Sequence, residues 1–470
     1  MKKIFDCSNF KYRIFQYLAA LAANLGMFSI GLHYGWPSSS LPILTSGNYT
    51  FSMSNSEASW MVAITPMGSV IGDLIAGFTL NTFGRKKMIM VSSIPLTVSW
   101  ILVAVAQSSV YLFIARIIAG IVDGLLFTAI PPYLAEIADP EIRGFLGTTY
   151  FVTLVFGMLV SNVLLFFLSI PISAYIACTV SAFMLLILPF LPESPYFHLM
   201  RNEMLQAKAS LQKFRGRGEV TEELGRISKG ILEEERSGTG GVMELVTNRY
   251  NRKCLLLAIL MTVVQQTTGV LAIQSYAETV FQETKHIIRP DVANIIYFAL
   301  YFLATLIALV LVDVSGRRPL FLISITIVCI ALFTNGTYLY LKNATSINLD
   351  GYESIQILAL LVFTVAYSIG LNNIPVLVSS EIFPSHIKGK AFCVINVSFS
   401  FASTFVIKYF GWTNEAVGMY VPFYTYAACS AVGAVSIALL MPETKKKTLE
   451  DIQMELAGGE REEKSANGVI

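Results

Sequence analysis

Long runs of apolar residues, separated by short polar loops, recur along the whole chain. Each is about as long as the roughly 20 residues that a helix needs to cross a bilayer. Six runs precede a polar stretch from Pro192 to Arg252 and six follow it. They lie at about 14–36, 57–80, 88–107, 110–135, 145–169, 171–191, 253–280, 291–313, 319–341, 353–380, 389–411 and 419–441. The pattern predicts an all-α polytopic membrane protein of twelve transmembrane helices in two pseudo-symmetric six-helix bundles.

The composition supports a membrane protein rather than a soluble one. Hydrophobic residues make up 54% of the 470 positions, charged residues only 14%, and the mean hydropathy is +0.63. The predicted parts are a cytoplasmic N-terminus (1–13), a first bundle (14–191), a cytoplasmic linker with amphipathic helices (192–252), a second bundle (253–441) and a cytoplasmic tail (442–470). Within the linker, residues 197–214 read as one amphipathic helix.

The distribution of basic residues assigns the two sides of the membrane. The linker holds ten Lys or Arg residues, whereas the segments predicted to lie outside hold only Lys285, Arg289 and Lys342. By the positive-inside rule both termini are cytoplasmic. The sequons at Asn48 and Asn343 then fall in outside loops, where glycosylation is possible. We expect a multi-pass protein of the cell membrane.

Several functional classes find no support. The cysteines have no metal-type spacing, the histidines in polar loops have no ligand-like spacing, and no phosphate-binding GxxxxGK[ST] motif is present. We therefore expect no enzyme, no metal and no cofactor. The net charge of +2 does not indicate nucleic acid. The expected partners are the lipid bilayer and a small solute, and the expected unit is a monomer.

The two sets of six runs repeat one another in their cytoplasmic loops. Three signals recur in the same order in both halves, which indicates a duplication with parallel halves and a site between them near the midplane. The pairs are Gly84-Arg85-Lys86 with Gly316-Arg317-Arg318, Glu136 and Arg143 with Glu381 and Lys388, and Pro192-Glu193-Ser194-Pro195 with Pro442-Glu443-Thr444.

Charged groups at these inner helix ends are candidates for a gate. Guanidinium and carboxylate groups can form bidentate pairs that tie one bundle to the other when the inner side is shut. The candidates are Arg85, Glu136, Arg143, Glu193, Arg317, Glu381, Lys388 and Glu443. Basic residues there could instead serve only to set topology, an explanation that does not apply to the acids.

Amide and hydroxyl groups on the seventh run are candidates for binding a polyhydroxylated solute, because each such group matches a hydroxyl that both donates and accepts. Gln265, Thr268 and Ser275 share a stripe at helical spacing with Gly269 and Ala272, and Gln266 adjoins it. Asn372 on the tenth run is included with them. Hydrogen bonding between helices is the alternative role for such groups.

Charged residues inside the runs are costly and usually functional. Arg116 and Asp123, seven residues apart on the fourth run, are expected to pair. This pair is the basis of an alternative function, a proton-coupled solute symporter. The first run carries only Asn24 and His33, not the acid that proton coupling would use.

The motifs together resemble the sugar porters of the major facilitator superfamily, most closely the insect facilitated trehalose transporters. The resemblance covers the whole chain. Besides the three repeated signals, it is carried by Gly35-Trp36, Leu41-Pro42, Ser59-Trp60, Arg116 with Gly120, Gln265-Gln266 with Gly269, Glu381-Ile382-Phe383-Pro384, Glu443-Thr444-Lys445 and Thr448-Leu449-Glu450. It implies facilitative transport of a sugar, a hexose or trehalose, by alternating access. Gly269 and Pro375 would absorb the bending.

This sequence departs from the family's sugar site at several positions. The family's polar residues are replaced by Phe151, Leu271 and Tyr301, its Gly-Pro pair by Asn372-Asn373, its Trp by Val376, and its Asn-Trp pair by Phe399-Ser400. Fewer polar groups remain for a polyol. A sensor that binds solute without transporting it is therefore a further alternative.

Overall fold

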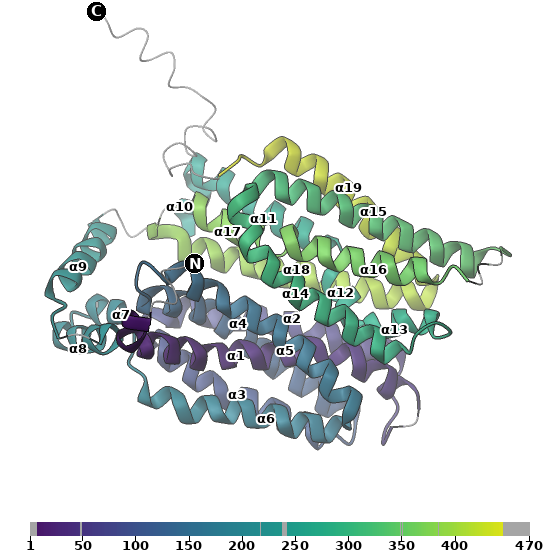
Figure 1. Cartoon of the computed structure of the whole chain (residues 1–470), viewed down its shortest axis with the longest axis horizontal. Coiled ribbons are helices and arrows are strands. Elements are labelled where there is room, and N and C mark those ends of the chain that lie inside the picture. The colour runs from purple at the N-terminus through teal and green to yellow at the C-terminus, as the bar shows by residue number, and fades with distance from the viewer. Residues whose placement is uncertain are drawn as a thin grey trace, which may run out of the picture. The chain divides into compact units, whose positions relative to one another are not determined.

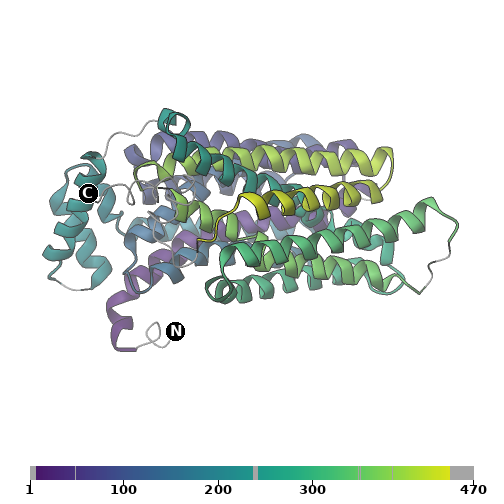
Figure 2. The same ribbon diagram turned by 90° about the horizontal axis from the view of Figure 1, so that it is seen from above.

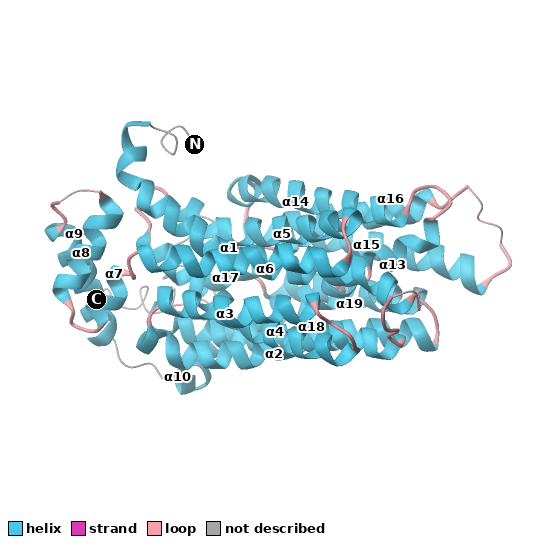
Figure 3. Ribbon diagram, turned by 90° about the horizontal axis from the view of Figure 1, so that it is seen from below, coloured by secondary structure: helices cyan, strands magenta, loops and turns pink. Residues whose placement is uncertain are grey.

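The computed structural model describes residues 7–47, 49–216, 218–236, 242–347, 349, 351–383 and 385–444. Within these ranges the chain consists of helices and connecting loops, as Figures 1 and 3 show. Twelve of the described helical segments are long and apolar enough to cross a membrane. Their bounds fall within a few residues of the twelve predicted runs, except that the first continues to Thr45. The prediction of twelve spans is confirmed.

The first half of the chain contains six long helices followed by three short ones. They are α1 (Cys7–Thr45), α2 (Asn55–Phe83), α3 (Arg85–Ala104), α4 (Ser109–Ile137), α5 (Arg143–Phe167), α6 (Ile170–Ile187), the 3-10 turn η1 (Leu188–Phe190), α7 (Pro195–Met200), α8 (Met204–Arg215) and α9 (Thr221–Arg236). The helix α4 runs unbroken although it contains Pro131 and Pro132.

The second half has its spans divided into more pieces. They are α10 (Val242–Thr247), α11 (Arg249–Thr267), α12 (Val270–Ser275), α13 (Ala277–Phe281), the 3-10 turn η2 (Gln282–Thr284), α14 (Pro290–Ser315), α15 (Arg317–Ala344), α16 (Ser354–Ala366), the π-helical turn η3 (Tyr367–Leu371), α17 (Ile374–Ile382), α18 (Ser385–Ala416) and α19 (Tyr420–Leu440). The yellow α19 lies along the green α15 (Figures 1 and 2).

The chain forms two compact units. The first comprises Met1–Ser237 together with Gln274–Val280 and Pro290–Phe298, and the second comprises the remaining segments up to Ile470. The two short segments in the first unit belong to the seventh and eighth spans, which the sequence places in the second bundle. They join the first unit because hydrogen bonds described below attach them to α1 and α5.

Small residues let helices of the first unit approach closely. A Cβ atom added to Gly120 of α4 would lie 2.0 Å from the carbonyl oxygen of Thr65 in α2, and one added to Gly31 of α1 would lie 2.0 Å from that of Leu154 in α5. In a bilayer there is no hydrophobic drive between helices, so van der Waals contact of this kind is what holds them together.

The linker is helical and amphipathic, but it is not one helix over 197–214. The chain turns between α7 and α8, where Asn202 adopts a left-handed backbone with φ 59°. The apolar faces of α7, α8 and α9 form a small buried cluster of Leu199, Ala207, Leu211, Val220, Leu224 and Ile227. The linker helices therefore form a small packed layer at one end of the first unit (Figure 1).

Two spans of the second half are interrupted. Between α11 and α12 Gly269 takes φ +79°, and a Cβ atom there would lie 2.2 Å from Cδ2 of Tyr426. The stripe from Gln265 to Ser275 is thus divided between two helices rather than continuous. The tenth span changes from α16 through the π-helical η3 to α17, and Pro375 stands in the first turn of α17.

We predict that Gly120→Val destabilises the protein, because any side chain at this position collides with the backbone of α2. Overpacking of this kind costs about 1–3 kcal/mol or more. The measurement is the apparent Tm in detergent, together with the amount of protein at the membrane. Gly147→Val is the matched control, since a Cβ atom at Gly147 in α5 meets nothing within 4 Å. Equal Tm values for the two variants would contradict the prediction.

Candidate functional site

A carboxylate caps the start of α3 in the first unit. The chain turns sharply at Gly84, with φ 96° and ψ 156°. Glu193 follows the sixth span, and its carboxylate accepts hydrogen bonds from the backbone N–H groups of Lys86 (2.9 Å) and Lys87 (3.3 Å). These are N–H groups that a helix start leaves unpaired, and a negative charge there also matches the helix dipole.

A buried ion pair lies beside this cap. Arg85 Nε donates to Glu136 Oε1 of α4 at 3.1 Å, and the hydroxyl of Ser194 donates to the other oxygen of Glu136. Both side chains are mostly buried. Residues from all three predicted signals of the first half, though not Arg143, therefore meet in one structure, here called the first corner and made of Gly84, Arg85, Glu136, Glu193 and Ser194.

The second half repeats this arrangement. Gly316 has φ 90° and ψ 157°, and the carboxylate of Glu443 accepts from the backbone N–H groups of Arg317 and Arg318, both at 3.1 Å. Arg317 Nη2 donates to Glu381 Oε1 at 3.0 Å, and Thr444 donates to the other oxygen of Glu381. This second corner consists of Gly316, Arg317, Glu381, Glu443 and Thr444. The internal repeat predicted from the sequence thus extends to individual hydrogen bonds.

The corners revise how the predicted gate residues are understood. In the described residues, Arg85 pairs with Glu136, and Arg317 with Glu381, each within its own unit rather than between bundles. Arg143 lies exposed at the start of α5, and Lys388 lies partly buried in the first turns of α18. A part for Arg143 and Lys388 in an inner gate stays a prediction.

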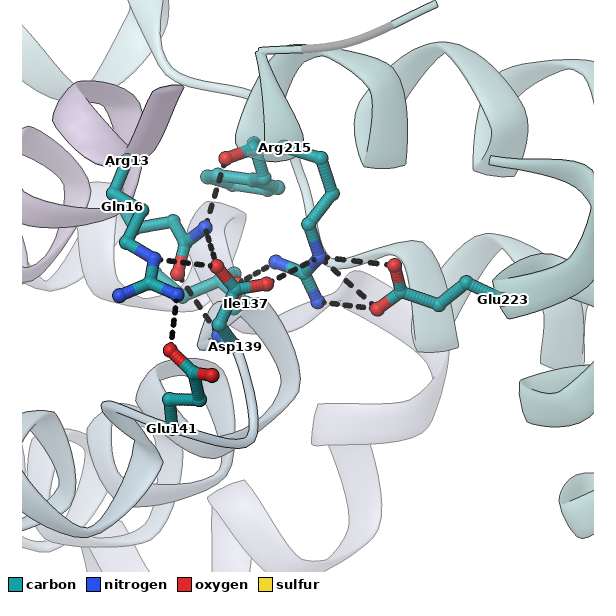
Figure 4. Close-up of polar contacts among 8 residues, drawn as sticks. Arg13, Gln16, Ile137, Asp139, Glu141, Arg215 and Glu223 are labelled. Atoms are coloured by element: carbon teal, nitrogen blue, oxygen red, sulfur yellow. Dashed lines mark hydrogen bonds and ion pairs between the residues drawn. The ribbon is translucent and has the colours of Figure 1, made fainter. Parts of the chain in front are cut away.

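A second set of charges attaches the linker to the first unit. Figure 4 shows Asp139, after α4, between two arginines: Arg13 Nε and Arg215 Nε each lie 2.9 Å from its carboxylate oxygens. Arg215 also binds Glu223 of α9 at 2.8 Å, and Gln16 donates to the carbonyl of Phe214 at 2.9 Å. This linker clasp joins α1, the loop after α4, α8 and α9.

The predicted sugar-site glutamines lie buried at the end of α11. Gln265 Nε2 donates to the backbone carbonyls of Leu371 (2.8 Å) and Asn372 (3.1 Å), and Gln266 Nε2 donates to Gln265 Oε1 (3.2 Å). The hydroxyl of Ser403 in α18 lies 3.1 Å from Gln266 Oε1. The contacts of Gln265 correspond to the alternative that the sequence left open, hydrogen bonding between helices.

The other predicted binding residues are distributed over both units. The hydroxyl of Thr268 donates to the carbonyl of Gln265 at 2.7 Å, at the helix end. Ser275 is buried but belongs to the first unit. Asn372 is 5% exposed, its Oδ1 accepts from the hydroxyl of Tyr301 at 3.3 Å, and its Nδ2 has no hydrogen-bond partner. In the second unit, therefore, the glutamines at the end of α11 lie beside the end of η3, where Asn372 follows.

The predicted pair of Arg116 and Asp123 is wrong. Arg116 Nη1 donates to the carbonyl of His33 at 2.6 Å and the guanidinium lies over the ring of Trp36, whereas Asp123 Oδ2 accepts from the hydroxyl of Tyr34 at 2.7 Å. Seven residues of helix rise about 10 Å, too far for an ion pair along one face. Both residues are buried.

A buried polar cluster in the first unit was missed. Asn294 Nδ2, at the start of α14, donates to Asn162 Oδ1 of α5 (2.7 Å) and Ser39 Oγ of α1 (3.0 Å). Ser38 Oγ donates to Asn294 Oδ1 (2.9 Å), and the backbone N–H of Glu278 donates to Ser38 (3.3 Å). Asn162 and Asn294, two polar residues inside apolar runs, were the available signal. The cluster attaches the α13 and α14 segments to the first unit.

The remaining predicted positions are placed as follows. Asn343 is exposed in the last turn of α15, and Asn48 lies outside the described residues. Among the substituted positions, Leu271 and Tyr301 are buried, Phe151 and Phe399 are partly buried, and Val376 is exposed. No group of three or more His, Cys, Asp or Glu side chains that could hold a metal is found among the residues that the structure describes.

Comparison with known sequences gives matches over nearly the whole chain. Residues 18–456 match the family described as Sugar (and other) transporter. The facilitated trehalose transporter Tret1 of Bombyx mori is 30% identical over 451 residues, covering 95% of this chain and 88% of that protein. The Tret1 of Anopheles gambiae is 32% identical, and the match covers 94% of this chain and 56% of that protein.

Solved structures with a similar fold include the xylose transporter XylE from E. coli. Its partially occluded inward-open form has a TM-score of 0.78 and 23% identity, covering 93% of this chain and all of that one. The proton:xylose symporter XylE bound to 6-bromo-6-deoxy-D-glucose has a TM-score of 0.75 and 23% identity, with 95% of this chain covered.

Because the two corners repeat the same contacts, we predict the same effect for equivalent substitutions in each. Replacing Glu193 or Glu443 by Gln keeps an acceptor oxygen but removes the charge at the helix start, so each variant should lose about 1 kcal/mol of stability. The two losses should be similar because the geometries are. The measurement is the apparent Tm in detergent at low salt. Glu415→Gln, at an exposed acid of α18, is the control. A loss in only one half would contradict the equivalence of the corners.

Proposed function

Because the chain belongs to the Sugar (and other) transporter family, we propose that it carries a hexose or trehalose across the membrane by facilitated diffusion. Its fold is that of the major facilitator superfamily, as the sequence predicted. It is a multi-pass membrane protein, and a carrier rather than an enzyme. The observation that carries the proposal is the match of residues 18–456 to the family.

The choice of sugar is supported by the relatives and by buried amides. Two relatives that match over at least 94% of this chain are named facilitated trehalose transporters. Gln266 and Asn372 place amide groups at the interrupted spans of the second unit, where hydroxyl groups of a sugar would find both donors and acceptors. Of the predicted binding set, Gln265, Thr268 and Ser275 serve as supports or secondary contacts in this proposal.

The topology of the proposal follows from the charge distribution. Both corners and the linker clasp gather the basic segments that the positive-inside rule assigns to the cytoplasm. We place the protein in the cell membrane as a monomer with both termini inside and with Asn48 and Asn343 outside as glycosylation sites. The corners would then act as an inner gate, in which Arg143 and Lys388 join during closure.

Proton coupling is the weaker alternative. It rested on a pair between Arg116 and Asp123 that the described residues do not form. A sensor without transport rested on the substituted positions, of which Tyr301 retains a polar contact to Asn372. Both alternatives make a different prediction for flux, so one transport experiment separates them.

Uptake of labelled hexoses, disaccharides and polyols into proteoliposomes tests the proposal. We expect saturable flux of at least one sugar that stops at equal concentrations inside and outside, because a facilitative carrier only follows the gradient. Liposomes without protein are the control. Accumulation driven by a pH gradient would identify a symporter instead, and absence of saturable flux for every solute would identify a sensor.

A second prediction concerns the inner gate. If the second corner acts as the inner gate, Glu381→Ala, which removes the carboxylate that Arg317 and Thr444 bind, should make the inner end open more often. Cysteines introduced along the inner cavity should then be labelled faster from the cytoplasmic side by a membrane-impermeant maleimide, by about tenfold if one net charged hydrogen bond is lost. Glu353→Ala, directly before the start of α16, is the control. Unchanged labelling would remove Glu381 from the gate.

A further inference from the structure

The hydrogen bonds of Gln265 fix the direction of its amide. Both partners of Nε2 are backbone carbonyls, at Leu371 and Asn372, and a carbonyl can only accept. Both N–H protons of Gln265 are therefore used, and its Oε1 accepts from Gln266. The residue braces the backbone at the end of η3, where Pro375, which has no N–H, cannot donate to the carbonyl of Leu371 four residues earlier. Gln265 has no donor left for a ligand.

Gln266 makes fewer hydrogen bonds with its side-chain amide than Gln265 does. One proton of Nε2 goes to Gln265, and its Oε1 lies near the hydroxyl of Ser403, which also donates to the carbonyl of Phe399 at 2.6 Å. A hydroxyl has one proton, so Ser403 shares it between two acceptors. Gln266 accordingly keeps one donor and part of its acceptor capacity.

Two asparagine amides lie between η3 and α17, at the interruption of the tenth span. Asn372 and Asn373 each have a buried Nδ2 with no hydrogen-bond partner in the described structure. Leaving such a donor buried and unpaired costs about 1–3 kcal/mol. The cost is sustained at two adjacent residues, which are the ones that replace the family's Gly-Pro pair. This concentration of unpaired donors points to an acceptor that binds there.

The contact with Tyr301 sets the direction of the Asn372 amide. The Tyr301 hydroxyl donates to Asn372 Oδ1 at 3.3 Å, so the oxygen faces α14 and the N–H₂ group faces away from it. Tyr301 is itself 3% exposed. It is one of the substituted positions of the sugar site. Its hydroxyl is the hydrogen-bond donor that orients the Asn372 amide.

We propose that the N–H₂ groups of Asn372 and Asn373 are the ligand-facing donors of the second unit, with Tyr301 as their positioning residue. They recognise oxygens that only accept hydrogen bonds, namely the ring oxygen and bridging ether oxygens of a cyclic sugar. This deepens the proposed function and rests on it. Hydroxyl groups of a sugar can donate or accept, whereas ether oxygens have no proton and therefore match groups that present only donors.

The test compares two substrates that differ at one atom. The first is the cyclic sugar that the unmodified protein transports fastest, and the second is its analogue with CH₂ in place of the ring oxygen. We expect the unmodified protein to prefer the parent sugar about tenfold in kcat/KM, the effect of one hydrogen bond. Asn372→Leu or Asn373→Leu, which lack the donor at nearly the same volume, should reduce this ratio to about one.

Two further variants separate positioning from folding. Tyr301→Phe should lower the ratio severalfold with normal amounts at the membrane, and it decides the matter if a Leu variant does not fold. Tyr409→Phe, which removes a phenol bonded to Thr425 Oγ1 at 2.8 Å elsewhere in the second unit, is the matched control and should keep the tenfold ratio.

The outcomes distinguish this inference from the proposed function. Absence of sugar flux in the unmodified protein would overturn the proposed function. Flux with no preference for the parent sugar would overturn only the inference, as would a tenfold preference that persists in both Leu variants and in Tyr301→Phe.

Discussion

Inside a bilayer every backbone N–H and C=O group must find a partner within the protein, because no water is available to replace a lost helical hydrogen bond. The interruptions of the helices are therefore the positions where side chains become indispensable. At the corners, Glu193 and Glu443 occupy the N–H groups at two helix starts. At η3, Gln265 occupies two carbonyls. In both corners and at η3, side chains thus pair with backbone groups at a helix interruption.

Periodicity and charge were sufficient for the architecture. Apolar runs of membrane length predict helices reliably because only a helix satisfies its own backbone in lipid. The corners were also predictable as sets of residues, since Arg85 with Glu136 and Arg317 with Glu381 recur in order in both halves. The sequence could not show which carboxylate binds which donor. Glu193 accepts from backbone N–H groups, which almost every residue has, so the side chains of Lys86 and Lys87 do not reveal this contact.

Side-chain partners within the spans were the least predictable. Equal spacing on a helix suggested that Arg116 pairs with Asp123, but both found nearer partners on α1, whose position along α4 depends on tertiary packing. The role of Gln265 was equally hidden, because its partners are carbonyls of a π-helical turn that no residue pattern announces. Asn202 interrupts the linker helix by a left-handed conformation that Asn merely tolerates.

The likeness of the two corners contrasts with the difference between the fourth and tenth spans. The fourth span is one continuous helix, whereas its counterpart passes through η3. The two halves therefore share the capped turn and differ within the fourth and tenth spans. Each half can therefore be compared with the other. The capped turns, which both halves share, belong to the common scaffold, and η3, which only the tenth of these two spans contains, marks a position where the halves differ in role.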